Sequence, residues 1–398
     1  MKIDLCVDIS IDVTSPSLEQ LLKGFVKAVR GMFEQFIREA ILHFGNEYMK
    51  NGKLAKAIGS SEVVWKTSKG NVMTRIATLF GNIRVPQLQV RDRASGKRFF
   101  ITRTLLEIGK RQRIPIITKK YLGLMGSLAP LRVVNKFLSM TSGVKYSLMT
   151  IVRAIRDTAS TISFGIDEKE TGEFEADGTG LPIIKAGKRG KELEILAQRT
   201  RKGRIRIAGM VISDYKKGWK TLFKPLKKAL RRFKEIFLIT DGDTSPLKGL
   251  DDIKVILQRC LFHIPHEMKY TLWKDKVKRK SKPWKYALAK ILEITTLKRI
   301  RDDPGIAFNL IKWKRNLLTR LIHFCEKKKW RNTASYLSAA KPDIFGGIER
   351  RISGGTTSLI ERVMRTVNQR INIAQWSAKT ALAVAQLRGA YYYNGFDV

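Results

Sequence analysis

Three acidic residues lie at points of the sequence where their carboxylates can meet. Asp177 follows an apolar-polar alternation in FEADGTG, Asp241 ends the apolar run of FLITDGD, and Glu361 lies in the first turn of an expected helix in TTSLIERVMRTVNQR. Carboxylate oxygens are the ligands that hard divalent cations such as Mg²⁺ prefer. Three clustered carboxylates repel one another and raise their own pKa values unless a cation or a basic side chain is close. The sequence therefore predicts that these three residues share a divalent metal site.

Each of these acids also has a structural explanation. Asp177 and Asp241 both precede a glycine and could serve only as turn residues. Asp243, two residues after Asp241, makes the choice of the second metal ligand ambiguous. We favour Asp241 because it directly ends the strand-like run, where a strand tip projects its side chain into a site. Ser358 and Glu361 match a capping box, in which the glutamate accepts from the backbone N–H of Ser358 instead of binding a metal.

A Cys-x-x-His pair follows the second aspartate along the chain. Cys260 and His263 invite a metal interpretation, but two ligands do not complete a structural zinc site, and His266 improves the case only slightly. Because the pair follows an expected buried strand, Cys260 can equally be a core residue. The three cysteines, which include Cys6 and Cys325, are far apart and odd in number, so we expect reduced thiols.

The chain carries a large excess of positive charge, with 77 lysines and arginines against 35 acidic residues and a formal net charge of +42 at pH 7. The excess runs along the whole chain, which predicts a polyanionic partner, nucleic acid first, with a solvated basic surface as the alternative. No stretch approaches the ~20 apolar residues of a membrane-spanning helix. The start MKIDLCVDIS lacks the layout of a signal peptide, so we expect an intracellular protein without a membrane partner.

Basic residues are concentrated between residues 184 and 233, where they predict salt-dependent contacts to DNA phosphates with little sequence preference. A second set follows Glu361 on the same expected helix, which would present a carboxylate beside phosphate-binding groups. The candidate DNA-binding residues of these two regions are Arg199, Arg201, Lys202, Arg204, Lys216, Lys217, Arg362, Arg365 and Arg370.

The N-terminal part of the chain predicts three kinds of local structure. Residues 15–48 have helical apolar spacing and should form one long helix whose apolar face packs on its own domain or, alternatively, on a second copy. Residues 63–101 alternate like the strands of small hairpins. Residues 119–160 predict helices joined by a short turn, as in a helix-turn-helix. Lys145, Tyr146 and Thr150 would begin its recognition helix, although any helical hairpin gives this pattern.

From Glu173 onward the pattern predicts the order β-β-β-α-β-α-β, which is a mixed α/β class of fold. Helices follow over roughly 266–344, and a final pair is expected over 357–372 and 375–392. Four tryptophans of the first helical stretch lie near lysine-rich runs, where they could stack an unpaired base or form the core of a bundle. These are Trp273, Trp284, Trp313 and Trp330.

That order, with an aspartate in the first strand, another after the fourth and a glutamate on a helix after the fifth, resembles the RNase H-like catalytic domain of DDE transposases. Three motifs narrow the resemblance to the Mutator-like group of prokaryotic insertion-sequence transposases. They are FEADGTG, the LITDGD that precedes RCLFH, and TTSLIERVMRTVNQRIN. The resemblance covers about residues 174–388, with weaker support from the N-terminal hairpins and helices.

The resemblance implies a fold, a set of ligands and a set of partners. It implies an RNase H-like domain with a mixed five-stranded sheet, interrupted by an all-α insertion and preceded by a β-hairpin region and a helix-turn-helix-like region. Asp177, Asp241 and Glu361 would hold two Mg²⁺ or Mn²⁺ ions per active site, and His263 would orient a phosphate or the attacking group. The implied partners are double-stranded DNA, as terminal inverted repeats and target, and further copies of the chain in a dimer or larger oligomer. The implied location is the cytoplasm of a prokaryote, at the nucleoid.

The implied domain boundaries divide the chain into six segments. They are 1–60 for the long helix, 61–118 for the β-rich region, 119–165 for the helix-turn-helix-like region, 166–265 for the first part of the catalytic core, 266–350 for the insertion, and 351–398 for the helices with Glu361.

The implied reaction is metal-dependent phosphodiester cleavage at transposon ends, followed by transfer of the 3′-hydroxyls into target DNA. Such chemistry needs a nucleophilic oxygen in line with the leaving oxygen and positive charge near the reacting phosphate. Two alternatives remain open. One is a DNA-binding regulator with an inactive RNase H-like domain, and the other is a structure-selective nuclease without strand transfer.

Overall fold

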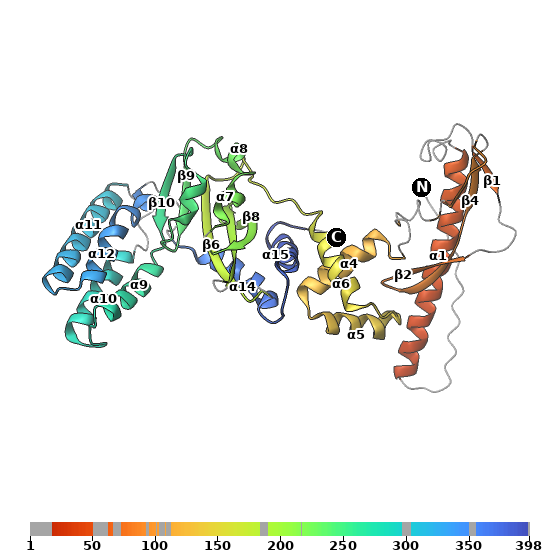
Figure 1. Cartoon of the computed structure of the whole chain (residues 1–398), viewed down its shortest axis with the longest axis horizontal. Coiled ribbons are helices and arrows are strands. Elements are labelled where there is room, and N and C mark those ends of the chain that lie inside the picture. Colours follow the sequence, from red (N-terminus) through yellow and green to blue (C-terminus); the bar gives the residue numbers. More distant parts are fainter. Residues whose placement is uncertain are drawn as a thin grey trace. The chain divides into compact units, whose positions relative to one another are not determined.

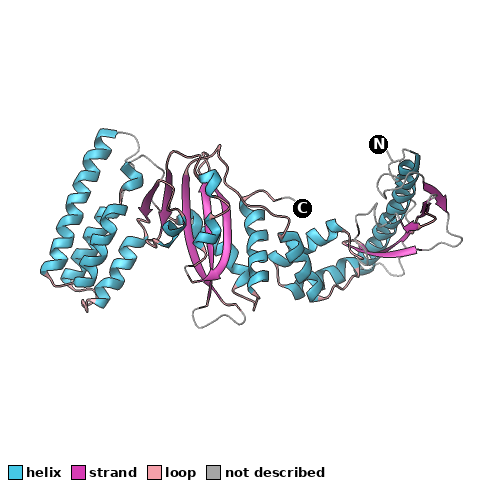
Figure 2. Cartoon of the chain, turned by 45° about the horizontal axis from the view of Figure 1, so that its top comes forward, coloured by secondary structure: helices cyan, strands magenta, loops and turns pink. Residues whose placement is uncertain are grey.

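The computed structural model describes residues 18–50, 63–66, 73–92, 95–100, 102, 108, 113–183, 190–215, 217–296, 304–349 and 356–396. The chain divides into two compact units, which meet in sequence between Thr161 and Ile162. Figure 1 and Figure 2 show both units, and each is described by itself.

The first unit begins with α1, which spans Leu18–Lys50 and agrees with the expected long helix. The hairpin of β2 (Met73–Thr78) and β3 (Gly81–Pro86) lies against it. Ile41 of α1 joins Ile76 and Ile83 in a small buried core. Part of the apolar face of α1 therefore packs on its own unit, which is the first of the two alternatives considered from the sequence.

A second, antiparallel sheet of the first unit has the strand order β1-β4-β5. Its strands are β1 (Val63–Lys66), β4 (Gln89–Asp92) and β5 (Arg98–Phe100). The hairpins expected over residues 63–101 are thus split between two small sheets.

The described part of the first unit also includes the helices α4 (Ile116–Leu128), α5 (Leu131–Ser142) and α6 (Leu148–Ala159). α4 and α6 pack closely because Gly123 has no side chain. A Cβ there would lie 2.7 Å from the carbonyl oxygen of Ala154. α5 ends at Gly143, whose φ of 67° is favourable for glycine, and Ser147 caps α6 by accepting from the N–H of Thr150 (3.0 Å). α5 and α6 are therefore helices joined by a short turn, as was expected.

The second unit is built on a five-stranded mixed sheet with the order β10-β9-β6-β7-β8. Three consecutive strands form an antiparallel meander, and the last two run parallel to the first. The strands are β6 (Glu173–Leu181), β7 (Lys191–Arg199), β8 (Ile205–Asp214), β9 (Ile236–Thr240) and β10 (Val255–Arg259). The mixed α/β class and the predicted order of these strands are confirmed.

Helices cover both faces of this sheet, as Figure 2 shows. On one face, Trp219 and Phe223 of α7 (Trp219–Phe223) pack with Phe174 of β6, together with α8 (Lys227–Leu230) and the 3₁₀ helix η1 (Ser245–Gly249). On the other face lie α14 (Ser358–Ile371) and α15 (Ala378–Tyr393). Gly389 of α15 lets that helix approach the side chain of Ile207 on β8.

A block of four helices follows β10 and has its own buried core. Its helices are α9 (His263–Lys274), α10 (Lys282–Thr295), α11 (Pro304–Lys327) and α12 (Arg331–Ala340). Trp330 belongs to this core and Trp284 is partly buried against it, whereas Trp273 and Trp313 are exposed. The core explanation therefore holds for two of the four tryptophans.

The chain returns from the helical block to the sheet through η2 (Lys341–Asp343) and α13 (Gly346–Glu349). The amide of Gln258 on β10 fixes this return: its Nε2 donates to the carbonyl of Ile344 (2.7 Å), and its Oε1 accepts from the N–H of Gly347 (2.9 Å). Within the described part of the chain, no helix has both the length and the apolar content needed to cross a membrane.

Candidate active site

Asp177 and Asp241 lie next to each other where the parallel pairing of β6 and β9 ends, at the carboxyl end of β9. Glu175 of β6 pairs with Ile239 of β9, and two further residues in this register bring Asp177 level with Asp241, which directly follows β9. Neighbouring strands are about 4.8 Å apart, and side chains two residues apart point to the same face. The sheet therefore brings together two acids that are far apart in the sequence.

The pKa of Asp177 depends on its burial and on the charged groups near it. Burial raises the pKa of Asp177 to about 7, and the charges of Asp241 and Glu361 act in the same direction. The N–H of Gly178 donates to its Oδ1 (2.8 Å) and, with the charge of His263, acts in the opposite direction. Asp241, His263 and Glu361 are therefore near enough to Asp177 for their charges to act on its pKa.

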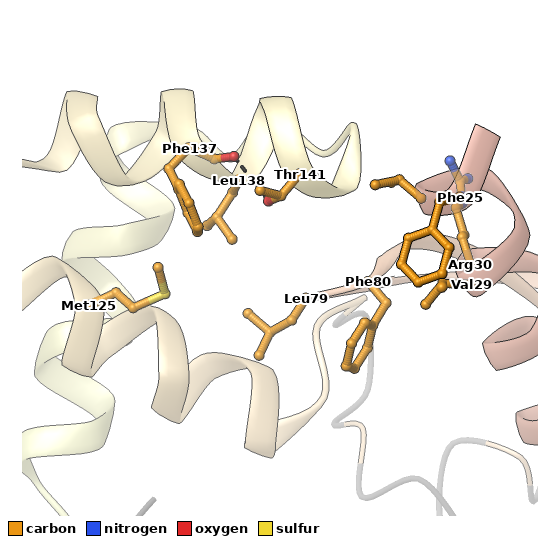
Figure 3. A pocket seen from close by; sticks show the side chains of 10 residues that line it. Phe25, Val29, Arg30, Leu79, Phe80, Met125, Phe137, Leu138 and Thr141 are labelled. Atoms are coloured by element: carbon orange, nitrogen blue, oxygen red, sulfur yellow. Dashed lines mark hydrogen bonds between the residues drawn. The ribbon is translucent and has the colours of Figure 1, made fainter. Parts of the chain in front are cut away.

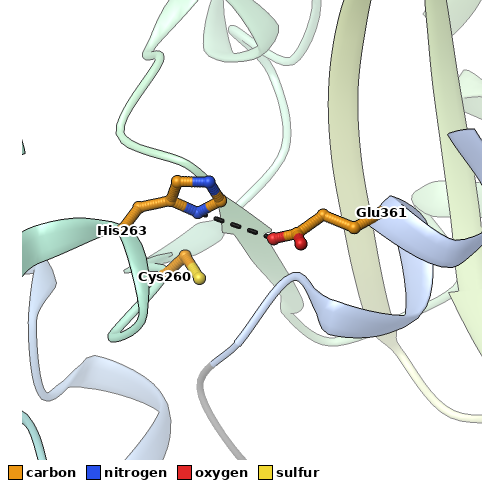
Figure 4. A group of neighbouring side chains, drawn as sticks. All are labelled: Cys260, His263 and Glu361. Carbon is orange, nitrogen blue, oxygen red and sulfur yellow. Dashed lines mark ion pairs between the residues drawn. The ribbon is translucent and has the colours of Figure 1, made fainter. Parts of the chain in front are cut away.

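Glu361 projects from the first turn of α14 toward His263, as Figure 4 shows. Its Oε1 lies 3.7 Å from Nδ1 of His263 and accepts a hydrogen bond from the hydroxyl of Thr357 (3.0 Å). α14 has its N-cap at Thr357, and Ser358 is its first helical residue. The capping box considered from the sequence is therefore not formed, and the carboxylate of Glu361 is directed into the cluster instead.

Cys260 and His263 flank the end of β10 and the start of α9. Their hydrogen bond is the main cause that raises the pKa of His263 to about 9 against the effect of burial, and the charges of Glu361 and Asp241 contribute. Burial alone would raise the pKa of the buried Cys260 thiol, but hydrogen bonds with His263 and Thr357 lower it. Both shifts favour a positively charged imidazolium among the carboxylates at neutral pH.

Cys260, His263 and Glu361 also form a second candidate for cation binding. Among the described residues, these three make the one group of at least three such side chains whose ligand atoms all lie within 4.8 Å of one another. Sulfur and nitrogen ligands suit Zn²⁺ better than Mg²⁺, and the imidazolium would have to lose its proton first. Asp177, Asp241 and Glu361 do not meet this spacing. The mixed set is therefore the one within ligand distance in the part of the chain that the structure describes, and it shares Glu361 with the oxygen-only set predicted from the sequence.

Replacing Cys260 with serine separates these two sets. An oxygen-only site has no sulfur ligand, so Cys260→Ser should leave Mn²⁺ affinity almost unchanged in a titration followed by electron paramagnetic resonance. A mixed site would lose a direct ligand, and even a group that only supports a ligand contributes about 10–100-fold to affinity. A loss of that size in Cys260→Ser would assign the cation to Cys260, His263 and Glu361.

A buried ion pair holds α14 against the sheet beside the cluster. Glu175 lies on the same face of β6 as Asp177, and its Oε1 is 2.7 Å from Nη2 of Arg199 on β7. Its Oε2 accepts from the backbone N–H of Ile360 (2.9 Å), the residue that precedes Glu361. Nη2 of Arg199 also lies 3.4 Å from the carbonyl oxygen of Thr356. The pair therefore fixes the turn that presents Glu361.

This arrangement changes the interpretation of Arg199. The sequence predicts a phosphate contact there, but the side chain is buried and directed at α14, so it is not available to DNA. Glu175 is a site residue that the sequence analysis missed. The sequence carries no signal for it, because Glu175 takes the polar position between Phe174 and Ala176, and its burial depends on Arg199 and Ile360.

The glycine after Asp241 is required by its surroundings. Gly242 has a φ of 119°, and a Cβ there would lie 2.8 Å from Nη1 of Arg259. Arg259 is buried, with Nη2 3.7 Å from Oδ2 of Asp343 and its guanidinium over the ring of Tyr336. A positive charge thus lies beside the turn that carries Asp241.

Most of the basic residues that were predicted to contact phosphates from the sheet region are exposed. Arg201, Lys202 and Arg204 are exposed in the turn between β7 and β8, and Lys217 is exposed after β8. Lys216 lies outside the described residues.

The three arginines predicted on α14 differ in their placement. Arg362 and Arg365 are exposed. Arg370 is buried, with its guanidinium 4.8 Å from the centre of the Trp376 ring, so that prediction is corrected: the side chain packs inside the unit instead of facing DNA.

The helix-turn-helix residues of the first unit also differ. Lys145 is exposed and Thr150 is half-buried at the start of α6. Tyr146 is buried, its hydroxyl donates to the carbonyl of Thr78 (3.1 Å), and burial raises its pKa to about 12. Tyr146 therefore connects the helices to the β2–β3 hairpin, and the prediction that it contacts DNA is corrected.

An apolar hollow of about 340 Å³ lies in the first unit between α1, the β2–β3 turn, α4 and α5 (Figure 3). Its lining includes Phe25, Phe80, Met125 and Phe137. The titratable side chain in the lining is Arg30, whose Nη2 donates to the carbonyl of Asn82 (2.6 Å). Without an acid, histidine or cysteine in its lining, this hollow offers no catalytic chemistry.

No protein-family model matches the chain, and no curated protein matches it.

Proposed function

We propose that the chain is a DNA transposase that cuts transposon ends and transfers their 3′-hydroxyls into target DNA with the help of divalent cations. The observation that carries this proposal is the position of Asp177 beside Asp241 on adjacent parallel strands, with Glu361 near enough for its charge to act on Asp177. Burial, with these two charges, raises the pKa of Asp177 to about 7. A cluster of like charges is costly without a cation, and perturbed carboxylates of this kind are typical of functional sites.

The fold supports the same proposal. The sheet is a meander of three antiparallel strands with two more strands parallel to the first, and helices lie on both faces. Acids lie on the first strand, after the fourth strand and on a late helix, as the resemblance to an RNase H-like catalytic domain implies. In this proposal, α9–α12 are the helical insertion and α5–α6 are the DNA-recognition helices.

The ligand set fits Mg²⁺ or Mn²⁺. Asp177, Asp241 and Glu361 supply only oxygen atoms, and Asp241 is exposed enough to be reached from solvent. Two such ions, held by these three residues, would activate the nucleophile and stabilise the charge on the leaving oxygen.

Other residues of the chain would bind and orient the DNA. His263, which is an imidazolium at neutral pH because its pKa is about 9, would donate a hydrogen bond to a phosphate oxygen near Glu361. Arg362 and Arg365 on the exposed side of α14 would contact the flanking phosphates. Arg201, Lys202 and Arg204 are exposed in the β7–β8 turn, near the start of β6, and would contact phosphates farther from Asp177.

One assay tests the proposal. The protein is incubated with labelled candidate terminal repeats and supercoiled target DNA, with and without Mn²⁺, and the products are separated on denaturing gels. A transposase gives Mn²⁺-dependent nicks at the repeat ends and joined products. Nicks at junctions without joining would indicate a structure-selective nuclease, and binding without any cleavage would indicate a DNA-binding regulator.

The pKa of Asp177 gives a prediction for pH. Below about pH 7 its carboxyl must lose a proton before it can bind a cation, so Mn²⁺ affinity should rise about tenfold per pH unit up to that pH and then level off. The raised pKa also stabilises the metal-free protein at low pH, and this contribution is lost as the pH rises through about 7. Calorimetric titrations with Mn²⁺ and melting curves on either side of pH 7 measure both effects. A flat affinity profile would contradict the assignment of Asp177 as a ligand.

A further inference from the structure

A row of aromatic side chains lies on the surface of α9, which runs from the edge of the sheet into the helical block (Figure 1). Phe262 directly precedes the helix, and His266 and Tyr270 follow at intervals of four residues, which places them on one face. Trp273 lies one turn further on. Phe262 is 57% exposed, Tyr270 48% and Trp273 69%, so the row is largely open to solvent.

The rings of this row, Phe262, His266, Tyr270 and Trp273, lie close to one another. The ring centres of Phe262 and His266 are 4.9 Å apart, and those of Tyr270 and Trp273 are 5.7 Å apart with an angle of 18° between the planes. Nζ of Lys274 lies 4.4 Å from the centre of the Tyr270 ring. The side chains therefore support one another as two small aromatic pairs on the helix surface.

The opposite face of α9 supplies the packing of the helical block. Ile264, Met268 and Leu272 are buried in its core. The aromatic row is thus not needed to hold α9 in place, and exposed apolar groups of this number are typical of a surface that binds a partner.

The charges around the row indicate the chemistry of that partner. The exposed acid on α9 is Glu267, and Asp275 after the helix accepts hydrogen bonds from Asn332 and Thr333 of α12. Exposed basic residues are much more numerous along the helix and the turn that follows. They are Lys269, Lys274, Lys276, Lys278, Arg279 and Lys280. The partner should therefore be an anion with flat apolar faces.

We propose that this row binds an unpaired DNA strand by stacking successive bases on Phe262, His266, Tyr270 and Trp273, while the surrounding lysines contact its phosphates. Bases in a duplex are already stacked on one another, so only a single strand can offer its faces to these rings. The row spans about 16 Å at 1.5 Å per helical residue, which suits about four or five bases.

The position of Phe262 indicates the path of the bound DNA strand along α9. Phe262 adjoins His263, and their ring centres are 5.9 Å apart, so the row begins at the candidate active site and leads away from it. This inference rests on the proposed binding of DNA, but it does not depend on cleavage. In this inference, α9 binds the DNA strand that separates from its complementary strand next to the reacting phosphate.

Fluorescence anisotropy tests the inference with a labelled oligothymidylate of about 15 nucleotides, a duplex of the same length and an abasic strand of the same length. The full-length protein is measured without divalent cations, so that no strand is cut. Tyr270→Ala and Trp273→Ala should each weaken binding of the oligothymidylate by about 5–100-fold, because each stacked base contributes that much. Binding of the duplex and of the abasic strand should stay within about twofold.

Two control variants accompany these changes. Trp313→Ala removes a tryptophan of α11 that is 47% exposed, and it should leave binding of the oligothymidylate unchanged. Trp273→Phe keeps a flat ring and should retain most of the affinity. Circular dichroism and melting curves establish that every variant is folded.

The outcomes separate this inference from the proposed function. Equal losses for the single strand, the duplex and the abasic strand, or an equal loss in Trp313→Ala, would overturn the stacking role of α9, as would unchanged binding in Tyr270→Ala and Trp273→Ala. Selective loss of single-strand binding in a protein that never cuts DNA would support the role of α9 and remove the proposed transposase activity.

Discussion

Replacing either Asp177 or Asp241 with asparagine should abolish Mn²⁺-dependent cleavage while DNA binding is retained. Asparagine keeps the shape of the side chain but removes the charge that holds the cation. A bound metal ion contributes several kcal/mol to such a reaction, which corresponds to a loss of about a thousandfold or more in rate. The rate is measured on labelled repeat ends under single-turnover conditions, and DNA binding is measured by gel shift at fixed salt.

The sequence DGD supplies a matched control for this experiment. Asp243 lies two residues after Asp241, but its Oδ1 accepts hydrogen bonds from the N–H and the hydroxyl of Ser245. Asp243→Asn should therefore cleave at a rate close to that of the unchanged protein. If Asp243→Asn were inactive and Asp241→Asn active, the assignment of the second carboxylate would be wrong.

Removing the charge of Glu175 should have a large effect on both stability and activity. Glu175→Gln leaves Arg199 buried without its counter-charge, and breaking a buried ion pair in this way costs about 3–5 kcal/mol. The second unit should melt about 10 °C lower as a result. Cleavage should fall as well, because the turn with Ile360 and Glu361 loses its anchor. Calorimetry and the cleavage assay measure the two effects.

A double replacement separates positioning from stability. Glu175→Leu combined with Arg199→Met removes both charges, and an apolar pair in place of a buried ion pair is often neutral or stabilising. The double variant should recover most of the melting temperature but not the cleavage rate, because the N–H of Ile360 has lost its acceptor. As a surface control, Asp252→Asn breaks the exposed ion pairs with Lys227 and Arg231, and it should leave the melting temperature almost unchanged. Recovery of cleavage in the double variant would contradict a positioning role for Glu175.

Much of the second unit is predictable from local sequence. The apolar alternation of its strands gives their order, and the run that ends in Asp241 places that residue at a strand tip. The helical spacing after Thr357 places Glu361 in a first turn. These predictions succeed because each depends on residues close together in the chain.

The features that the sequence does not give depend on contacts between distant segments. Glu175 contacts Ile360 across 185 residues, and no local pattern announces a glutamate that binds a backbone N–H so far away. Tyr146 and Arg370 look like surface residues in the sequence, yet the β2–β3 hairpin and Trp376 cover them. The same limit applies to the tryptophans, since helical spacing alone does not tell the core position of Trp330 from the exposed position of Trp273.

The central claim is that Asp177, Asp241 and Glu361 bind divalent cations together. Anomalous diffraction from crystals soaked in Mn²⁺ tests it most directly, because it locates the ion and its ligands without any assumption about the DNA. The account predicts manganese in contact with carboxylate oxygens of all three residues. Manganese held instead by Cys260, His263 and Glu361, or bound without Asp177 and Asp241, would contradict it.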